Sequence, residues 1–229
     1  MAIINKTNFE FLESLSENNH REWFNENKEW YQKEHENTIE IADRILKLLS
    51  ETDQLSTASG KASLMRIYRD VRFSKDKSPY NPRWAGSFNR VKPDLRGGYY
   101  FRIQPGDSIV GGGFYNPNAD DVKLIREHIA QEDEPLRKIM ADPNFKKMFG
   151  EMQGEKLKTA PKGFEKEHPA LDLLQFKSMY CFRSFSDKEV MSKDFPEKAV
   201  ETFLAIRPFF DLMTEYLTTD MNGISLINS

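Results

Sequence analysis

The chain has 229 residues, 38% hydrophobic and 30% charged, with 33 Lys and Arg against 36 Asp and Glu. This composition is typical of a soluble globular protein that buries a core without disulfides. No apolar run approaches the roughly 20 residues that cross a bilayer, so we expect no membrane contact. The single Cys181 has no partner for an intrachain disulfide, and the N-terminus lacks an apolar signal segment. We therefore expect a cytoplasmic protein.

Helical patterns dominate residues 7–50. Thr7 and Glu10 have the spacing of a capping box, and apolar residues follow with a helical period. A longer helical pattern begins near His20, and its weakly apolar middle, residues 34–40, predicts a break. The same pattern carries three aromatic residues that we expect to pack against helices rather than to form a stacking platform: Trp23, Trp30 and Tyr31.

Residues 61–115 are strand-rich, with turn residues between short runs of alternating polarity. Connections this short favour an antiparallel meander, so we predict adjacent antiparallel strands. The triple glycine at 111–113 lacks the Lys and Ser or Thr of a phosphate loop, and we interpret it as a bulge or a close backbone approach. The four candidate strands are Ser63–Phe73, Trp84–Val91, Gly98–Gln104 and Ser108–Phe114.

Residues 118–229 are helical and mixed. Asn118 is expected to start one helix, and Asp142 with Pro143 another that ends before Gly150. A second helix is expected between these two, over Pro135–Met140. An irregular segment over Gly154–Pro169 precedes a short helical turn and a strand within Leu171–Phe185. A last helix starts near Asp194–Pro196 and is expected to be interrupted at Pro208. Together these elements predict a single α+β domain over residues 1–229, with a mainly antiparallel sheet packed by helices.

Positive charge is concentrated in one part of this acidic chain. Residues 61–102 contain 11 basic and 3 acidic residues. Strand alternation would place Ile67 and Phe73 on the core face. Arg66 and Arg72 would share the opposite face, where guanidinium groups could bind phosphate or carboxylate. The alternative is a solvated surface of Arg–Asp pairs. The candidate ligand-binding residues, the last three contributed by the irregular segment, are Arg66, Arg72, Lys77, Tyr80, Arg102, Lys158, Lys162 and His168.

Catalytic and metal-binding patterns are not evident. The four histidines are dispersed, so we expect no metal site, and nothing indicates a cofactor. Asp70, Asp76 and Asp172 have the chemistry of an acid or base, but their spacing establishes no pairing. Whether the protein is an enzyme stays open.

Four segments in order resemble the family called domain of unknown function 2461, found in bacteria and fungi. They are NNHREWFNENKEWYQ at 18–32, RDVRFSKDKSPYNP at 69–82, GGYYFRIQP at 97–105 and LKTAPKGFEKEHP at 157–169. They span nearly the whole chain. The family often has a proline after its first block, where this chain reads EHENTIE. Because the family carries no established activity, cofactor or catalytic residues, the resemblance implies none here.

Three functional hypotheses follow. The first is a cleft lined by Arg and Lys that binds a small anionic ligand carrying phosphate or carboxylate. The second, less favoured, is a module for single-stranded nucleic acid, with bases stacking on Tyr68, Tyr80, Trp84, Tyr99 and Tyr100. The third is a protein-interaction module without chemistry. The oligomeric state is left open.

Overall fold

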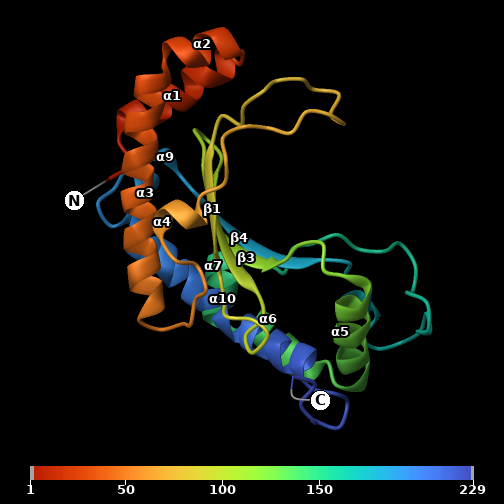
Figure 1. Cartoon of the computed structure of the whole chain (residues 1–229). Coiled ribbons are helices and arrows are strands. Elements are labelled where there is room, and N and C mark those ends of the chain that lie inside the picture. Colours follow the sequence, from red (N-terminus) through yellow and green to blue (C-terminus); the bar gives the residue numbers. More distant parts are fainter. Residues whose placement is uncertain (1–2, 228–229) are drawn as a thin grey trace. The chain divides into compact units, whose positions relative to one another are not determined.

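The structure is a computed structural model that describes residues 3–227, and it confirms the α+β class (Figure 1). Four strands form one antiparallel sheet in the order β1-β2-β3-β4. The strands are β1 (Trp84–Asn89), β2 (Gly98–Ile103), β3 (Ser108–Phe114) and β4 (Met179–Phe185). The helices are α1 (Lys6–Glu17), α2 (Arg21–Glu26), α3 (Lys28–Ser50), α4 (Gly60–Ser63), α5 (Ala119–Gln131), α6 (Glu134–Ala141), α7 (Pro143–Phe149), α8 (Leu171–Leu174), α9 (Asp187–Val190) and α10 (Phe195–Thr218).

The chain divides into two compact units. Unit 1 comprises Met1–Phe88, Tyr100–Val110 and Ser184–Glu201, and unit 2 comprises Asn89–Tyr99, Gly111–Arg183 and Thr202–Ser229. No described helix combines the length and the apolar character that crossing a membrane requires.

The packing of α1 on α3 forms the helical part of unit 1 (Figure 1). Phe11 is fully buried and contacts the rings of Trp23, Trp30, Tyr31 and Trp84. The expectation that the three aromatics of residues 20–32 pack against helices is thereby confirmed. Their mutual contacts bury large apolar surfaces, which is the dominant stabilising contribution available to a helix pair.

The N-terminal capping prediction was displaced by two residues. Asn5, not Thr7, is the N-cap of α1, and it forms a capping box with Asn8. The Thr7 hydroxyl instead donates to the side chain of Glu34 at 2.7 Å. Glu34 is buried against α1, and the Thr38 hydroxyl donates to its carbonyl. The weakly apolar stretch of α3 is therefore a polar helix–helix contact.

The predicted break at residues 34–40 is wrong for the same reason. The helix α3 is continuous across that stretch, and the interruption lies at Asn27, which ends α2. The side chain of Asn27 donates to the carbonyl of Trp23, which satisfies an acceptor at the end of α2.

The predicted strand over Ser63–Phe73 is also wrong. Residues 60–63 form α4, and the following residues make only isolated bridges, Leu64 with Gly86 and Tyr68 with Tyr80. Pro79 and Pro82 on the opposing arm have no N–H to donate, so a continuous ladder cannot form. The other three predicted strands are confirmed as β1, β2 and β3.

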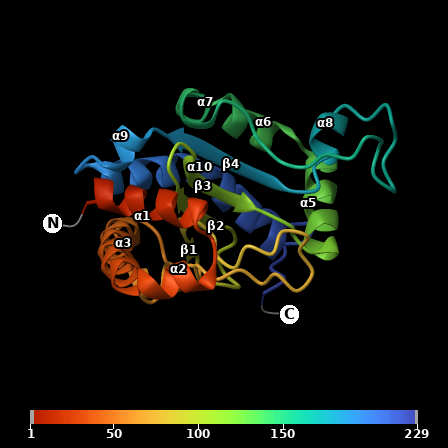
Figure 2. The same cartoon turned by 90° about the horizontal axis from the view of Figure 1, so that it is seen from above.

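In unit 2, α5 and α7 begin at the capping residues that the sequence predicts. Asn118 accepts from the backbone N–H of Asp121 at the start of α5. Asp142 caps α7, Pro143 is its first residue, and Gly150 follows its end with φ of 72°. In the view of Figure 2, α6 and α7 lie along β4, and Met148 of α7 contacts Arg183.

The expected interruption at Pro208 is absent, because α10 runs through this residue. A proline removes one backbone hydrogen bond, here the bond to the carbonyl of Leu204. Leu204 is an exposed residue of the helix, so water can satisfy the freed carbonyl.

The glycine run brings the backbones of β3 and β4 into close approach within unit 2. A Cβ on Gly111 would lie 1.9 Å from the carbonyl oxygen of Cys181. A Cβ on Gly113 would lie 2.4 Å from the Cα of Tyr180, and Gly113 has φ of 150°. The structural interpretation of residues 111–113 is therefore confirmed.

Gly111→Ala should lower the free energy of unfolding by at least about 3 kcal/mol, because the methyl group must displace the β4 backbone. Gly150→Ala is the matched control. It has φ of 72° and no neighbouring atom within 4 Å, so only backbone strain of about 1 kcal/mol is expected. Urea unfolding of the two variants measures the difference. Equal losses would contradict the close approach.

Candidate functional site

The basic segment predicted from the sequence forms a closed loop in unit 1, residues 64–83, here called the basic loop. Backbone hydrogen bonds join its two arms: Arg69 N–H donates to Pro79 at 2.9 Å, and Asn81 N–H donates to Ile67 at 2.7 Å. Ile67 is buried, whereas Tyr68 is exposed, so side chains alternate here without a regular strand. The loop is therefore a defined structure that projects its tip into solvent.

Asn19 anchors the loop to the helical part of unit 1. Its side chain donates to the carbonyl of Tyr80 and accepts from the N–H of the same residue, each at 3.1 Å. The Tyr80 ring is buried and stacks on Phe24 at 4.1 Å between centroids. Burial raises the pKa of the Tyr80 hydroxyl. Tyr80 thus holds the base of the loop, and Asn19, which was not among the predicted site residues, fixes its backbone.

Internal ion pairs occupy part of the positive charge at the loop tip. Arg69 pairs with Asp76 and also donates to the carbonyl of Ser78 at 3.2 Å. Hydrogen bonds from the side chain and backbone of Ser78, followed by that from Arg69, hold the pKa of Asp76 well below its usual range. Arg72 pairs with Asp70 at 2.6 Å and lowers the pKa of its carboxyl. For Arg69 and Arg72, the structure therefore agrees with the alternative interpretation, a solvated surface of Arg–Asp pairs.

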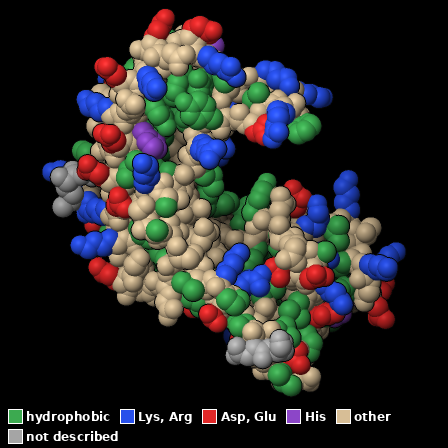
Figure 3. Space-filling model, in the orientation of Figure 1, with side chains coloured by type: hydrophobic (Ala, Val, Ile, Leu, Met, Phe, Trp, Pro, Cys, Tyr) green, Lys and Arg blue, Asp and Glu red, His purple; other side chains and the backbone are tan. Residues whose placement is uncertain are grey.

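Three further cations of the loop, Arg66, Lys75 and Lys77, are open to solvent. Among residues 3–227, the side chains of Arg66 and Lys75 have no hydrogen-bond or ion-pair partner. Lys77 donates only to the backbone carbonyl of Val71 at 3.0 Å. Figure 3 shows Lys and Arg side chains gathered along this loop. Its tip also exposes an aromatic ring, because Phe73 is 95% exposed and the guanidinium of Arg72 lies 5.9 Å from its centroid.

The other predicted site residues have local roles in the structure. Arg102 pairs with Asp107 at 2.6 Å across the turn between β2 and β3. In unit 2, Lys158 and Lys162 are exposed, and the Nδ1 of His168 accepts from the N–H of Ala170 beside α8. The predicted set is thus distributed over both units, and a contribution of the last three residues to anion binding stays a prediction.

Most of the proposed stacking residues are buried. Tyr80, Trp84 and Tyr99 are at most 3% exposed, so a base cannot reach their faces. Tyr68 is 57% exposed and packs its ring edgewise near Phe24. Phe73, which the sequence placed on the core face of a strand, is the exposed ring. Strand alternation continued as far as residue 73 therefore predicts the wrong side for the Phe73 ring.

Each of the three aspartates considered as an acid or base pairs with an arginine. Asp70 and Asp76 pair as described above, and Asp172 accepts from Arg137, which lowers its pKa. A lowered pKa keeps a carboxylate ionised but makes it a weaker base. Within residues 3–227, no cluster of three or more His, Cys, Asp or Glu side chains is arranged to hold a metal ion.

The fold and the basic loop define an α+β protein with an exposed cationic loop. A family model described as Conserved hypothetical protein (DUF2461) matches residues 7–212. The chain belongs to this family, as the resemblance of four segments indicated. Two of those segments meet in the structure, because Asn19 of the first binds Tyr80 of the second. No curated protein and no solved structure matches the chain.

Cys181 should be unreactive toward Ellman's reagent at pH 8 in the native protein and react fully in urea. Its side chain is fully buried, and burial raises the pKa of the thiol to about 12. A thiol ordinarily titrates at about 8.5. Its protonated form is therefore favoured by folding, and the corresponding stability is complete below about pH 8.5 and lost as pH rises toward 12. Rapid labelling without denaturant would contradict this placement.

Proposed function

We propose that the protein binds a phosphate-bearing ligand through the basic loop. The observation that carries this proposal is the set of cations left open to solvent, Arg66, Lys75 and Lys77, on a loop whose backbone is fixed at both arms. A preordered loop loses little conformational entropy on binding, which favours recognition of a flexible anion. Lys77 donates to the carbonyl of Val71, the residue before Arg72. Lys77 and Arg72 therefore lie together at the tip of the loop.

The charge of the loop supports an anion rather than a neutral ligand. Between residues 64 and 83 there are six Lys and Arg and two Asp. Both aspartates are paired, and the pairs at the tip are exposed, so solvent screens them. An incoming phosphate would compete with the Asp70 carboxylate for Arg72, which makes Arg72 a weaker contributor than an open cation.

Calorimetric titration with pyrophosphate tests this proposal. Replacing Arg66, Lys75 or Lys77 by Ala should weaken binding by roughly 10-fold each, since a charge-assisted hydrogen bond is lost. Arg72→Ala should weaken binding less and leave the melting temperature unchanged, because its ion pair is exposed. The matched control is Lys47→Ala on α3, an exposed lysine of the same unit. Unaltered affinity in all loop variants would sink the proposal.

A second candidate is single-stranded nucleic acid, favoured by the exposed ring of Phe73 beside Arg72. Base stacking on one aromatic side chain contributes about 1–3 kcal/mol. Phe73→Ala should then weaken binding of a labelled oligothymidylate without affecting pyrophosphate, and affinity should fall steeply with salt. Fluorescence anisotropy measures both effects. If neither probe binds, the protein-interaction hypothesis is favoured instead.

A further inference from the structure

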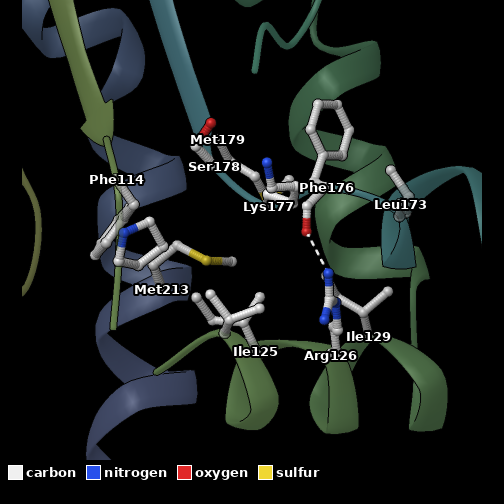
Figure 4. A pocket seen from close by; sticks show the side chains of 12 residues that line it. Phe114, Ile125, Arg126, Ile129, Leu173, Phe176, Lys177, Ser178, Met179 and Met213 are labelled. Atoms are coloured by element: carbon white, nitrogen blue, oxygen red, sulfur yellow. Dashed lines mark hydrogen bonds between the residues drawn. The ribbon is translucent and has the colours of Figure 1, made fainter. Parts of the chain in front are cut away.

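A second candidate site lies wholly within unit 2 and is independent of the basic loop. An apolar pocket is bounded by α5, the end of β3, the link between α8 and β4, and α10 (Figure 4). About 330 Å³ of space without protein atoms lies between these elements, and this figure includes open solvent. Its apolar wall includes Phe114, Ile125, Ile129, Leu173, Met179 and Met213.

One guanidinium borders this apolar space. Arg126 of α5 donates from Nε to the carbonyl of Leu174 at 2.8 Å and from Nη2 to the carbonyl of Phe176 at 3.0 Å. Figure 4 shows this side chain beside the pocket, with the contact to Phe176 drawn. These two bonds fix the plane of the guanidinium. The N–H groups of Nη1 and the second N–H of Nη2 remain, and two such donors have the geometry to bind a carboxylate end-on.

Arg126 differs from three other arginines of unit 2, because no carboxylate among residues 3–227 pairs with it. Arg90 pairs with Asp211, Arg96 with Asp121, and Arg137 with Asp133 and Asp172. Within residues 3–227, Arg126 contacts only the two carbonyls. It is partly buried, and burial lowers its pKa. A partly desolvated cation without a carboxylate is stabilised when an anion binds beside it.

The other charged group of the pocket is already neutralised. Lys177 binds Glu155 at 2.7 Å, and both side chains are well exposed. The Ser178 hydroxyl accepts from the N–H of Glu155. Positive charge available to a ligand is therefore localised at Arg126, while most of the surrounding wall offers apolar contact.

We propose that this pocket binds a short-chain aliphatic carboxylate, with its carboxylate on Arg126 and its alkyl chain between α5 and α10. The apolar wall favours an alkyl chain over a sugar or a nucleotide, since a polar ligand would lose hydration without gaining partners. The space between the walls is small and partly open to solvent, which restricts the chain to a short one.

Calorimetric titration of the full chain with hexanoate, hexanol and acetate tests the proposal. Hexanoate should bind saturably and at least about 10-fold more tightly than hexanol, which lacks the charge, or acetate, which lacks the alkyl chain. Arg126→Gln should reduce hexanoate affinity at least about 10-fold. Lys123→Gln is the matched control, because it removes an exposed charge from the same helix and should leave affinity unchanged.

A pocket-filling variant separates binding from folding, since Arg126 also ties α5 to the backbone beyond α8. Val122 lines the pocket but is partly exposed, so Val122→Phe should fold and abolish hexanoate binding. If Arg126→Gln fails to fold, the proposal is tested by Val122→Phe and by the relative affinities for hexanoate, hexanol and acetate. Equal affinity for hexanoate and hexanol, unchanged hexanoate binding in Val122→Phe, or no binding at millimolar hexanoate would each overturn the proposal.

Discussion

The backbone approach of β3 to β4 is the constraint on which unit 2 depends. Gly111 meets the carbonyl of Cys181, and Gly113 meets Tyr180, at distances that no side chain could occupy. The two strands are separated by more than sixty residues of helices and loop, so this contact closes a long segment of chain. Its closure brings Phe114, at the end of β3, and Met179, at the start of β4, to the wall of one pocket.

The sequence was sufficient to predict features that depend on residues close together in the chain. The caps Asn118 and Asp142 were predicted correctly, because each satisfies backbone donors within three residues. The predicted strand over Ser63–Phe73 failed although its alternation is real near Ile67, since a strand also needs a partner with free N–H groups. Likewise the stretch predicted to break is a continuous helix, in which buried Glu34 accepts from Thr7 of the neighbouring helix.

Charge counting identified the basic loop but not its chemistry. Sequence density cannot distinguish Arg69, which is bound by Asp76, from Arg66, which is open to solvent. The difference depends on the reversal of the chain at residues 70–78, which brings acidic side chains back onto arginines. Phe73 was misplaced for the same reason, because the turn changes the direction in which side chains point. The candidate residues could be predicted as a group, whereas their individual roles required the fold.

Arg126 illustrates the opposite case, in which sequence density gives no signal. It lies on an ordinary amphipathic helix among acidic and apolar residues, outside the basic segment. It is distinguished by its environment, which α8, β4 and α10 form together. This environment provides two backbone carbonyls and, among the described residues, no carboxylate. Arg126 has lost part of its hydration and interacts with backbone carbonyl dipoles, whereas Arg90 in the same unit pairs with the carboxylate of Asp211. The incomplete compensation at Arg126, rather than the number of nearby cations, is the physical reason to expect an anion there.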